Sequence, residues 1–500
     1  MYKPVVGLEI HVELSTKSKM FCSCVNDPNE RHPNVNICPI CTAQPGTLPV
    51  INKEAVRKVI KTGLSLKCQI PEYSKFDRKN YFYPDLPKGY QISQLYQPLC
   101  REGFLIINGK KIRIREVHLE EDTGKLIHPE GENYSLVDFN RAGIPLMELV
   151  TEPDLNSARE ARRFAEELQL ILRYLNVSDA DMEKGQLRVE VNISLAKKEG
   201  ELGTKVEIKN LNSFRSVEKA VDYEIERQTK ILKSGKKVLQ ETRGWDAPKG
   251  ITVSQREKEE AHDYRYFPEP DLPPLHLTSE LINEIRSEIP ELPQQKRERF
   301  KREYELDKKG VEVFVQNKDF GEYFEKVVSE LPPRLPQQDI KKLIKLASNY
   351  LITDLQGLLK GSSVIGEDFL ITPENFAEFI TLITERGEQG EPREGEDERS
   401  SLTYQGKISS KIAKIVLEEM FKTGADPSHI IEEKGLSQIT DGVEIKKIIE
   451  EVITQNPRAV QDFKKGKKNA FQYLIGQIMA KTKGKANPEI VNNLLKNLLI

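Results

Sequence analysis

Apolar and polar residues alternate with a period of two along several short stretches of the first 290 residues. The clearest stretch is residues 5–14, where apolar side chains from residue 8 onward alternate with charged ones and a histidine. This period is typical of a β-strand with one face on a core and the other turned away from it. Residues 112–120, 186–194 and 205–209 show the same alternation. The pattern predicts a largely antiparallel sheet.

Two longer stretches, residues 157–175 and 213–232, have apolar side chains at helical spacing instead. Each is expected to form a helix that packs an apolar stripe against its surroundings. Strands interspersed with helices predict an α+β domain over residues 1–290. A group of prolines marks the expected exit from this domain: Pro268, Pro270, Pro273 and Pro274.

The pattern turns helical and highly charged after about residue 290. We expect an all-α domain over residues 291–405 and a small α-helical tail domain over residues 406–500. Residues 386–400 are rich in Gly, Glu and Arg and contain no aliphatic or aromatic side chain. Such a segment buries too little apolar surface to order itself, so we interpret it as a mobile linker within the second domain.

The composition, with 38% hydrophobic and 31% charged residues, is typical of a globular protein. A chain of 500 residues is too long for one ordinary core, which agrees with several domains. No apolar run approaches the roughly 20 residues that a membrane span needs. The first residues alternate and lack the continuous apolar core of a signal peptide. A cytoplasmic protein that does not enter a membrane is therefore expected.

Four of the six cysteines form two close pairs. The pairs are Cys22 with Cys24 and Cys38 with Cys41, separated by thirteen residues. Two such pairs can supply four thiolates to one tetrahedral Zn²⁺, and this set favours a structural site because no ligand position stays open. Four unrelated thiols or redox pairs are the alternatives. Cys68 and Cys100 have no close partner in the sequence and are expected to be buried hydrophobes.

Acidic residues recur on the polar side of the predicted strands. The alternating sets are Glu9, His11 and Glu13; Glu116, His118 and Glu120; Glu190, Asn192 and Ser194; and Lys205, Glu207 and Lys209. For any single strand, a solvated charged face is the better explanation. If the strands share one sheet, however, their carboxylates gather on one face and repel one another unless cations intervene. An oxygen-rich site of this kind suits Mg²⁺, which would hold nucleotide phosphates.

ATP use would have to rest on this acidic face, because no Gly-Lys pair has the upstream glycine that a Walker A loop requires. Residues 76–94 combine basic and aromatic side chains that are able to bind phosphate and to stack on bases. The ATP-binding candidates in this stretch are Arg78, Lys79, Tyr81 and Lys88, accompanied by Phe82, Tyr83 and Tyr90. A packed lid without a ligand is the alternative interpretation.

Several long motifs follow one another along the chain: GLEIHVEL, SKMFCSC, FDRKNYFYPDLPKGYQISQ, HLEEDTGK, DFNRAGIPLMELVTEPD, EIKNLNSFRSVEKA and DYRYFPEPDLPP. Together they resemble the B subunits of the bacterial aspartyl/glutamyl-tRNA(Asn/Gln) amidotransferase, over essentially the whole chain. The resemblance implies a glutamine-synthetase-like cradle domain built on an antiparallel sheet, followed by a helical domain and a tail domain. It also implies an enzyme, an ATP-dependent carbon–nitrogen ligase.

The resemblance implies a two-step reaction on a mischarged tRNA. ATP phosphorylates the side-chain carboxylate of Glu-tRNA(Gln), Asp-tRNA(Asn) or both, and ammonia then replaces the phosphate. In the family the ammonia comes from glutamine through an amidase A subunit, and a small C subunit holds the heterotrimer together. This chain shows no amidase signature of its own, so a partner is expected to supply the ammonia.

The motif match also implies site residues. The implied active-site positions are Glu9, His11, Glu121, Glu148 and Glu207, of which the first four are the expected Mg²⁺ ligands. Glu190 matches an active-site position that is usually aspartate in the family, so its longer side chain puts a direct contact in doubt. His11 could remove a proton from ammonium, bind the metal or be a hydrogen-bonded structural residue.

The charge distribution bears on tRNA binding. The net charge of −2 argues against a nucleic-acid binder, whereas residues 456–500 carry nine Lys and Arg against two acids. The expected tRNA contacts are Lys464, Lys465, Lys467, Lys468, Lys481, Lys483 and Lys485. A solvated basic helix is the alternative for these lysines.

Two other functions fit part of the pattern. A glutamine-synthetase-like ligase acting on a small free carboxylate explains the acids but not the basic tail. A noncatalytic tRNA-binding scaffold explains the tail but not the acids.

Overall fold

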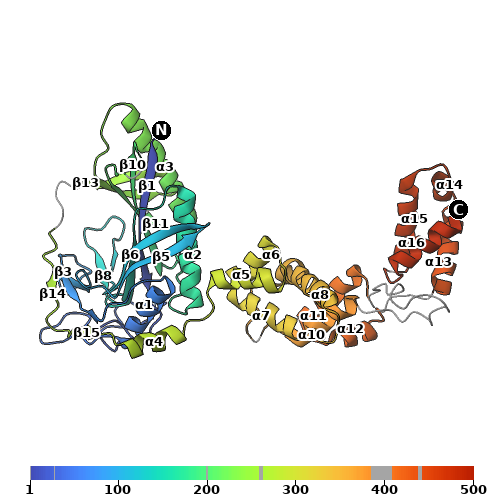
Figure 1. Ribbon diagram of the computed structural model, residues 1–500, viewed down its shortest axis with the longest axis horizontal. Helices are drawn as coiled ribbons and strands as arrows, with labels where there is room; N and C mark the ends of the chain where they lie inside the picture. Colours follow the sequence, from blue (N-terminus) through green and yellow to red (C-terminus); the bar gives the residue numbers. More distant parts are fainter. Residues whose placement is uncertain are drawn as a thin grey trace. The chain divides into compact units, whose positions relative to one another are not determined.

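The structure is a computed structural model that falls into two units, Met1–Pro293 and Gln294–Ile500. Figure 1 shows the chain coloured along the sequence. The segment 386–400, expected to be a linker, lies outside the described residues. The structure describes residues 2–27, 29–198, 201–257, 263–366, 368–384, 408–436, 442–482 and 484–499.

The first unit is built on an eight-stranded sheet. In spatial order its strands are β13 (Ile251–Glu257), β12 (Glu241–Asp246), β11 (Val206–Leu211), β10 (Leu187–Ala196), β1 (Lys3–Glu13), β9 (Pro145–Thr151), β6 (Lys110–Glu121) and β5 (Cys100–Ile107). The four strands expected from alternation are β1, β6, β10 and β11. The predicted α+β class is therefore confirmed.

One pair of neighbouring strands departs from the antiparallel arrangement. β11 and β12 run parallel, while the other neighbours in the sheet are antiparallel. The helix α3 (Phe214–Lys233) connects β11 to β12 and returns the chain to the starting end of the sheet, which is the connection that parallel strands need. The sheet is thus mixed.

Helices cover one face of this sheet. α2 (Ala158–Tyr174) and α3 lie along it, as Figure 1 shows, and α1 (Lys53–Ser65) packs on β5 and β6. The even-numbered apolar residues of β1, from Val6 to Val12, are at most 1% exposed in this core. Because side chains alternate along a strand, the odd-numbered residues of β1 lie on the opposite face.

Short strands next to the main sheet bring distant segments together. β3 (Asp77–Asn80) pairs with both β4 (Tyr90–Ser93) and β14 (Phe267–Pro268). The loop within residues 76–94 therefore lies beside the segment that follows residue 263. The remaining short elements of this unit are β2 (Tyr73–Ser74) with β15 (Leu275–His276), β7 (Lys125–Ile127) with β8 (Leu136–Asp138), and helix α4 (Ser279–Ser287).

The second unit is formed by a series of helices. They are α5 (Pro293–Glu303), α6 (Lys308–Gln316), α7 (Lys318–Ser329), α8 (Gln337–Tyr350), the π-helix η1 (Leu351–Leu355), α9 (Gln356–Leu359), α10 (Pro373–Thr384), α11 (Ser410–Thr423), α12 (Pro427–Glu433), α13 (Gly442–Gln455), α14 (Pro457–Lys464), α15 (Lys468–Lys481) and α16 (Pro488–Leu499). α11 and α12 contact α10, whereas α13, α15 and α16 share a separate apolar cluster. Among the described residues, no helix is long and apolar enough to cross a membrane.

Gly63 of α1 gives a direct test of the packing between helix and sheet. A Cβ added at Gly63 would lie 2.3 Å from the Sγ atom of Cys100, which is completely buried, as expected. We therefore expect Gly63→Ala to lower the free energy of unfolding by on the order of 1–3 kcal/mol, as measured by denaturant titration. Adding Cys100→Ala should recover part of this loss, because the sulfur is the nearest clashing atom.

Gly357 of α9 supplies the control for this test. No atom lies within 4 Å of a Cβ added at Gly357, so Gly357→Ala should not destabilise the protein. Equal stability of Gly63→Ala and the wild type would contradict the described contact between α1 and β5.

Candidate active site

The central strand β1 sets the positions of the acidic residues on the face of the sheet opposite the helices. Its register places Glu9 opposite Glu190 of β10, and His11 opposite Glu148 of β9. Glu148 in turn lies opposite His118 of β6. Cross-strand neighbours on one face of a sheet have side chains close enough to interact. Residues far apart in the sequence therefore converge.

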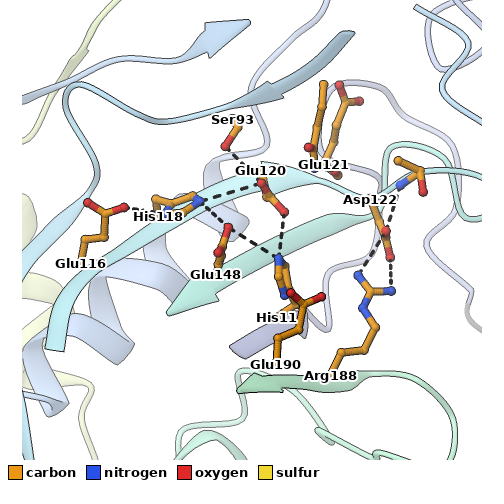
Figure 2. A network of polar contacts seen from close by, with 12 residues as sticks. His11, Ser93, Glu116, His118, Glu120, Glu121, Asp122, Glu148, Arg188 and Glu190 are labelled. Carbon is orange, nitrogen blue, oxygen red and sulfur yellow. Dashed lines mark hydrogen bonds and ion pairs between the residues drawn. The ribbon is translucent and has the colours of Figure 1, made fainter. Parts of the chain in front are cut away.

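One group, here called the histidine–carboxylate cluster, consists of His11, Glu120 and Glu148, whose ligand atoms lie within 4.8 Å of one another. His11 Nε2 is 3.5 Å from Glu148 Oε2 and 3.8 Å from Glu120 Oε1 (Figure 2). His118 Nε2 lies on the other side of Glu148, at 2.9 Å from the same oxygen. The arrangement offers one imidazole and two carboxylates to a cation.

Opposite charges within this cluster stabilise one another against the cost of burial. Burial alone favours neutral groups, yet His118 and His11 hold the pKa of Glu148 well below its ordinary value. Conversely, burial disfavours the charged form of His11, but the negative charge of Glu148 raises its pKa overall. The imidazoles and carboxylates of this cluster therefore favour each other's charged forms.

A second group, the acidic triad, consists of Glu9, Glu190 and Glu207, with ligand oxygens within 4.8 Å of one another. Burial, followed by repulsion from Glu148 and the other two triad members, raises the pKa of Glu9. Oxygen atoms are the ligands that Mg²⁺ prefers in proteins, so this donor set fits that ion. Asn192 Oδ1, a further oxygen beside Glu9, is buried and has no hydrogen-bond partner among the residues that the structure describes, which agrees with a cation site.

Glu121 is not a member of either group. Its Oε2 accepts a hydrogen bond from Lys88 Nζ at 2.6 Å, and its Oε1 accepts one from the backbone N–H of Ile92 at 3.0 Å. Figure 2 shows Glu121 turned away from Glu120. Neighbouring residues of a strand point to opposite faces, so β6 presents His118 and Glu120 to the cluster and Glu121 elsewhere.

The ATP-binding candidates of residues 76–94 separate into two pairs. Arg78 forms a bidentate ion pair with Glu269, at 2.7 and 2.9 Å, and lies over the ring of Tyr90. Lys88 is held by Glu121. These two cations therefore form internal ion pairs, which favours the packed interpretation for their part of the loop.

Lys79 and Tyr81 instead interact electrostatically with Glu120 of the histidine–carboxylate cluster. Burial disfavours the charge of Lys79, but the charges of Glu120, Glu148 and nearby tyrosines together outweigh burial and raise the pKa of this lysine. The Nζ atom lies 5.1 Å from the ring centroid of Tyr264 and 5.8 Å from that of Tyr81. Tyr264 is not among the predicted site residues, although it lies in the motif DYRYFPEPD that contributes to the family resemblance. A cation surrounded by aromatic rings next to the carboxylates can hold a phosphate group.

The predicted cysteine set does converge. The sulfur atoms of Cys22, Cys24, Cys38 and Cys41 lie within 4.8 Å of one another and could hold a metal ion. Hydrogen bonding from Cys22 and the charge of Lys19 lower the pKa of Cys41 to about 5, despite burial. Lys19 is completely buried, with Nζ 3.7 Å from Cys41 Sγ. Four sulfur atoms at one place with a compensating cation fit a tetrahedral Zn²⁺ site better than two separate redox pairs.

The tail lysines that the structure describes lie on or next to α14 and α15. Lys464 and Lys465 are exposed, Lys485 is half-buried, and Lys467 and Lys481 pair with Asp462 and Glu451. Lys483 and the side chain of Lys468 lie outside the described residues. The tRNA contacts of these lysines remain predictions.

Comparison with known proteins decides the family. A model of the GatB/GatE catalytic domain matches residues 4–283, and a model of the GatB domain matches residues 398–499. The chain belongs to the GatB family. This confirms the resemblance inferred from the motifs.

Among curated GatB relatives, the B subunit of the aspartyl/glutamyl-tRNA(Asn/Gln) amidotransferase of Thermotoga maritima is 50% identical over 508 residues, covering 100% of this chain and 99% of the relative. The proteins of the same name from Caldicellulosiruptor bescii and Persephonella marina are each 49% identical, with the same coverage.

Glu13 of β1, a buried residue on the same face as Glu9 and His11, gives a pH test of this GatB-family site. Burial and the neighbouring Asp122, which pairs with Arg188 at 3.1 Å, raise the pKa of Glu13 to about 7 from its ordinary 4.5. A carboxyl group with a raised pKa in the folded state binds protons more tightly there than in the unfolded chain. It therefore lowers stability progressively as the pH rises from about 4.5 to about 7.

Glu13→Gln stays neutral at every pH, so the variant should gain stability relative to the wild type as the pH rises. We expect a relative gain on the order of 2 kcal/mol between about pH 5 and about pH 8, measured by denaturant titration at each pH. Glu152→Gln, which removes a surface ion pair with Arg115, is the control and should show no such trend. A pH-independent difference for Glu13→Gln would contradict the assigned environment.

Proposed function

We propose that this chain is the subunit of a tRNA-dependent amidotransferase that activates a mischarged aminoacyl-tRNA and amidates it. The substrate is Glu-tRNA(Gln), Asp-tRNA(Asn) or both, in keeping with the names of the GatB relatives. The observation that carries the proposal is the convergence of the acidic triad and the histidine–carboxylate cluster on one face of a single sheet. Neither alternative function accounts for both this face and the basic tail.

The chemistry requires activation because a carboxylate is a poor electrophile. A side-chain carboxylate oxygen of the substrate attacks the γ-phosphorus of ATP, and ADP leaves. Ammonia then attacks the acyl carbon of the mixed anhydride, and inorganic phosphate leaves with the former carboxylate oxygen. Lys79 would hold phosphate oxygens through both steps, which is supported by its electrostatic interaction with Glu120 and by its contacts with the rings of Tyr81 and Tyr264.

Divalent cations would be held by the two groups of ligands. Glu9, Glu190 and Glu207 would bind one Mg²⁺, and His11, Glu120 and Glu148 another. Mg²⁺ bound there would neutralise charge on the phosphoryl group during transfer. We assign His11 to metal binding in preference to proton removal, because its ring nitrogen converges with two carboxylates. Tyr81 and Tyr264 would contact the nucleotide base, and Glu121 would hold Lys88.

The remaining parts of the proposal concern partners and the structural metal. An amidase A subunit would supply ammonia, and a small C subunit would complete the heterotrimer. The lysines of α14 and α15 would contact tRNA phosphates. Zn²⁺ bound by the four cysteines would stabilise the loop that carries them. A cytoplasmic location remains a prediction.

ATP hydrolysis with different carboxylate substrates tests the proposed function. With glutamine and the amidase partner present, we expect Glu-tRNA or Asp-tRNA to stimulate hydrolysis, and neither free glutamate nor uncharged tRNA to do so. Glu207→Gln should lower the stimulated rate at least about 100-fold, and the surface control Glu152→Gln should not. Stimulation by free glutamate would support the small-molecule ligase, and no hydrolysis with any substrate would support the scaffold.

Metal analysis tests the cysteine site. Protein purified without chelator should contain one zinc per four-cysteine cluster, and Cys38→Ser should lose most of the metal together with thermal stability, because three thiolates bind more weakly than four. Cys68→Ala removes a buried thiol outside the cluster and should retain the zinc. Wild-type protein free of zinc would contradict the assignment.

A further inference from the structure

Lys209 places a positive charge directly at the acidic triad. It lies on β11 two residues after Glu207 and on the same face of the strand. Its Nζ atom is 3.0 Å from Glu190 Oε2 and 3.6 Å from Glu207 Oε1. The motif match assigned no role to this lysine.

Each carboxylate of the triad is oriented by a different donor. Asn192 Nδ2 donates to Glu9 Oε1 at 2.8 Å, and Thr242 Oγ1 donates to Glu207 Oε2 at 2.6 Å. These two donors are neutral. Lys209 contacts the third carboxylate, Glu190, and brings a full charge, so it alone of the three donors competes electrostatically with an incoming metal ion.

The side chain of Lys209 is able to move away from this position. It is 39% exposed, and an ammonium group on a flexible four-carbon stem has three donors that fit carboxylate or phosphate oxygens. The triad is also where the proposed function needs phosphate and divalent cation together. The same ammonium group can thus neutralise Glu190 in one state and a phosphate in another.

We propose that Lys209 is a resident counter-cation that keeps the affinity of the acidic triad for free divalent metal low and releases Glu190 when a nucleotide binds. In the nucleotide-free protein its ammonium group pairs with the carboxylate of Glu190 and repels an incoming metal ion. When the phosphates of ATP reach the site, the ammonium group turns to them and Glu190 becomes a metal ligand. The acidic triad therefore binds its metal ion mainly when the nucleotide is bound as well. This inference rests on the proposed function, because it requires that a nucleotide bind at this face.

Direct measurement of Mn²⁺ binding to the purified full-length chain tests this inference, with Mn²⁺ as a paramagnetic substitute for Mg²⁺. The binding is measured by electron paramagnetic resonance, with and without a nonhydrolysable ATP analogue. In the wild type, the analogue should tighten Mn²⁺ binding. Lys209→Met should bind Mn²⁺ alone about three- to tenfold more tightly, because a positive charge next to the ion is lost and its effect is partly screened.

With the ATP analogue present, Lys209→Met should change the affinity for Mn²⁺ in the opposite direction. Lys209→Met should bind Mn²⁺ and the analogue together about three- to tenfold more weakly than the wild type, because a phosphate contact is lost. Lys209→Arg retains the charge and should behave nearly like the wild type in both conditions. Lys205→Met removes an exposed positive charge four residues earlier and should change neither affinity. Thermal melting of each variant shows whether it is folded.

Three results are distinguishable from the expected one. If Lys209→Met leaves the affinity for Mn²⁺ alone unchanged or weaker, the counter-cation role is overturned. An equal change with and without the analogue overturns the switch between Glu190 and phosphate. If wild-type protein binds no Mn²⁺ even with the analogue, the proposed function itself fails, whereas normal wild-type binding with an unresponsive Lys209→Met removes only this inference.

Discussion

Carboxylates that are held a few ångströms apart in a partly buried place repel one another, and the sheet of the first unit holds two such groups on one face. The structure reduces this repulsion in different ways. Imidazole rings flank Glu148, and three separate donors orient the triad. The compensation is incomplete, since the pKa of Glu9 is raised by burial and by its acidic neighbours. A face with residual negative charge is suited to bind divalent cations together with phosphate.

The cysteine loop is connected to this face through the segment that precedes β9. Lys19 Nζ contacts Cys41 and donates a hydrogen bond to the carbonyl oxygen of Phe139 at 3.2 Å. Asn34 of the same loop donates from its backbone N–H to Asp138 Oδ1 at 3.0 Å. A metal ion that orders this loop is therefore expected to stabilise the start of the strand that carries Glu148. We therefore expect the cysteine cluster to have a structural role next to the proposed active site.

Much of the fold and part of the site could be predicted from local patterns. Alternation identified the strands that carry the acids, and the spacing of the cysteines identified the four sulfur atoms that converge. The parallel pairing of β11 and β12 could not be predicted, because strand direction depends on where α3 returns the chain rather than on the residues of either strand. The order of the strands in the sheet is likewise a property of the tertiary structure.

The site shows where motif matching and strand geometry differ. The motif HLEED favoured Glu121, whereas the alternation of Glu116, His118 and Glu120 places Glu120 beside His11. Composition grouped Arg78 with Lys79, but only the fold shows that Arg78 pairs with Glu269 and that Lys79 interacts electrostatically with Glu120. Ion pairs with acidic residues from distant segments therefore determine which basic side chains of residues 76–94 are available to bind a ligand.

The central claim is that two groups of ligands on this face each bind a divalent cation. Counting the Mn²⁺ ions bound per chain in the presence of a nonhydrolysable ATP analogue tests it most directly. The account predicts two ions in the wild type, with Glu9→Gln removing one and Glu120→Gln removing the other, while Glu121→Gln retains both. A wild type that binds no Mn²⁺, or variants at Glu9 and Glu120 that both retain two ions, would contradict it.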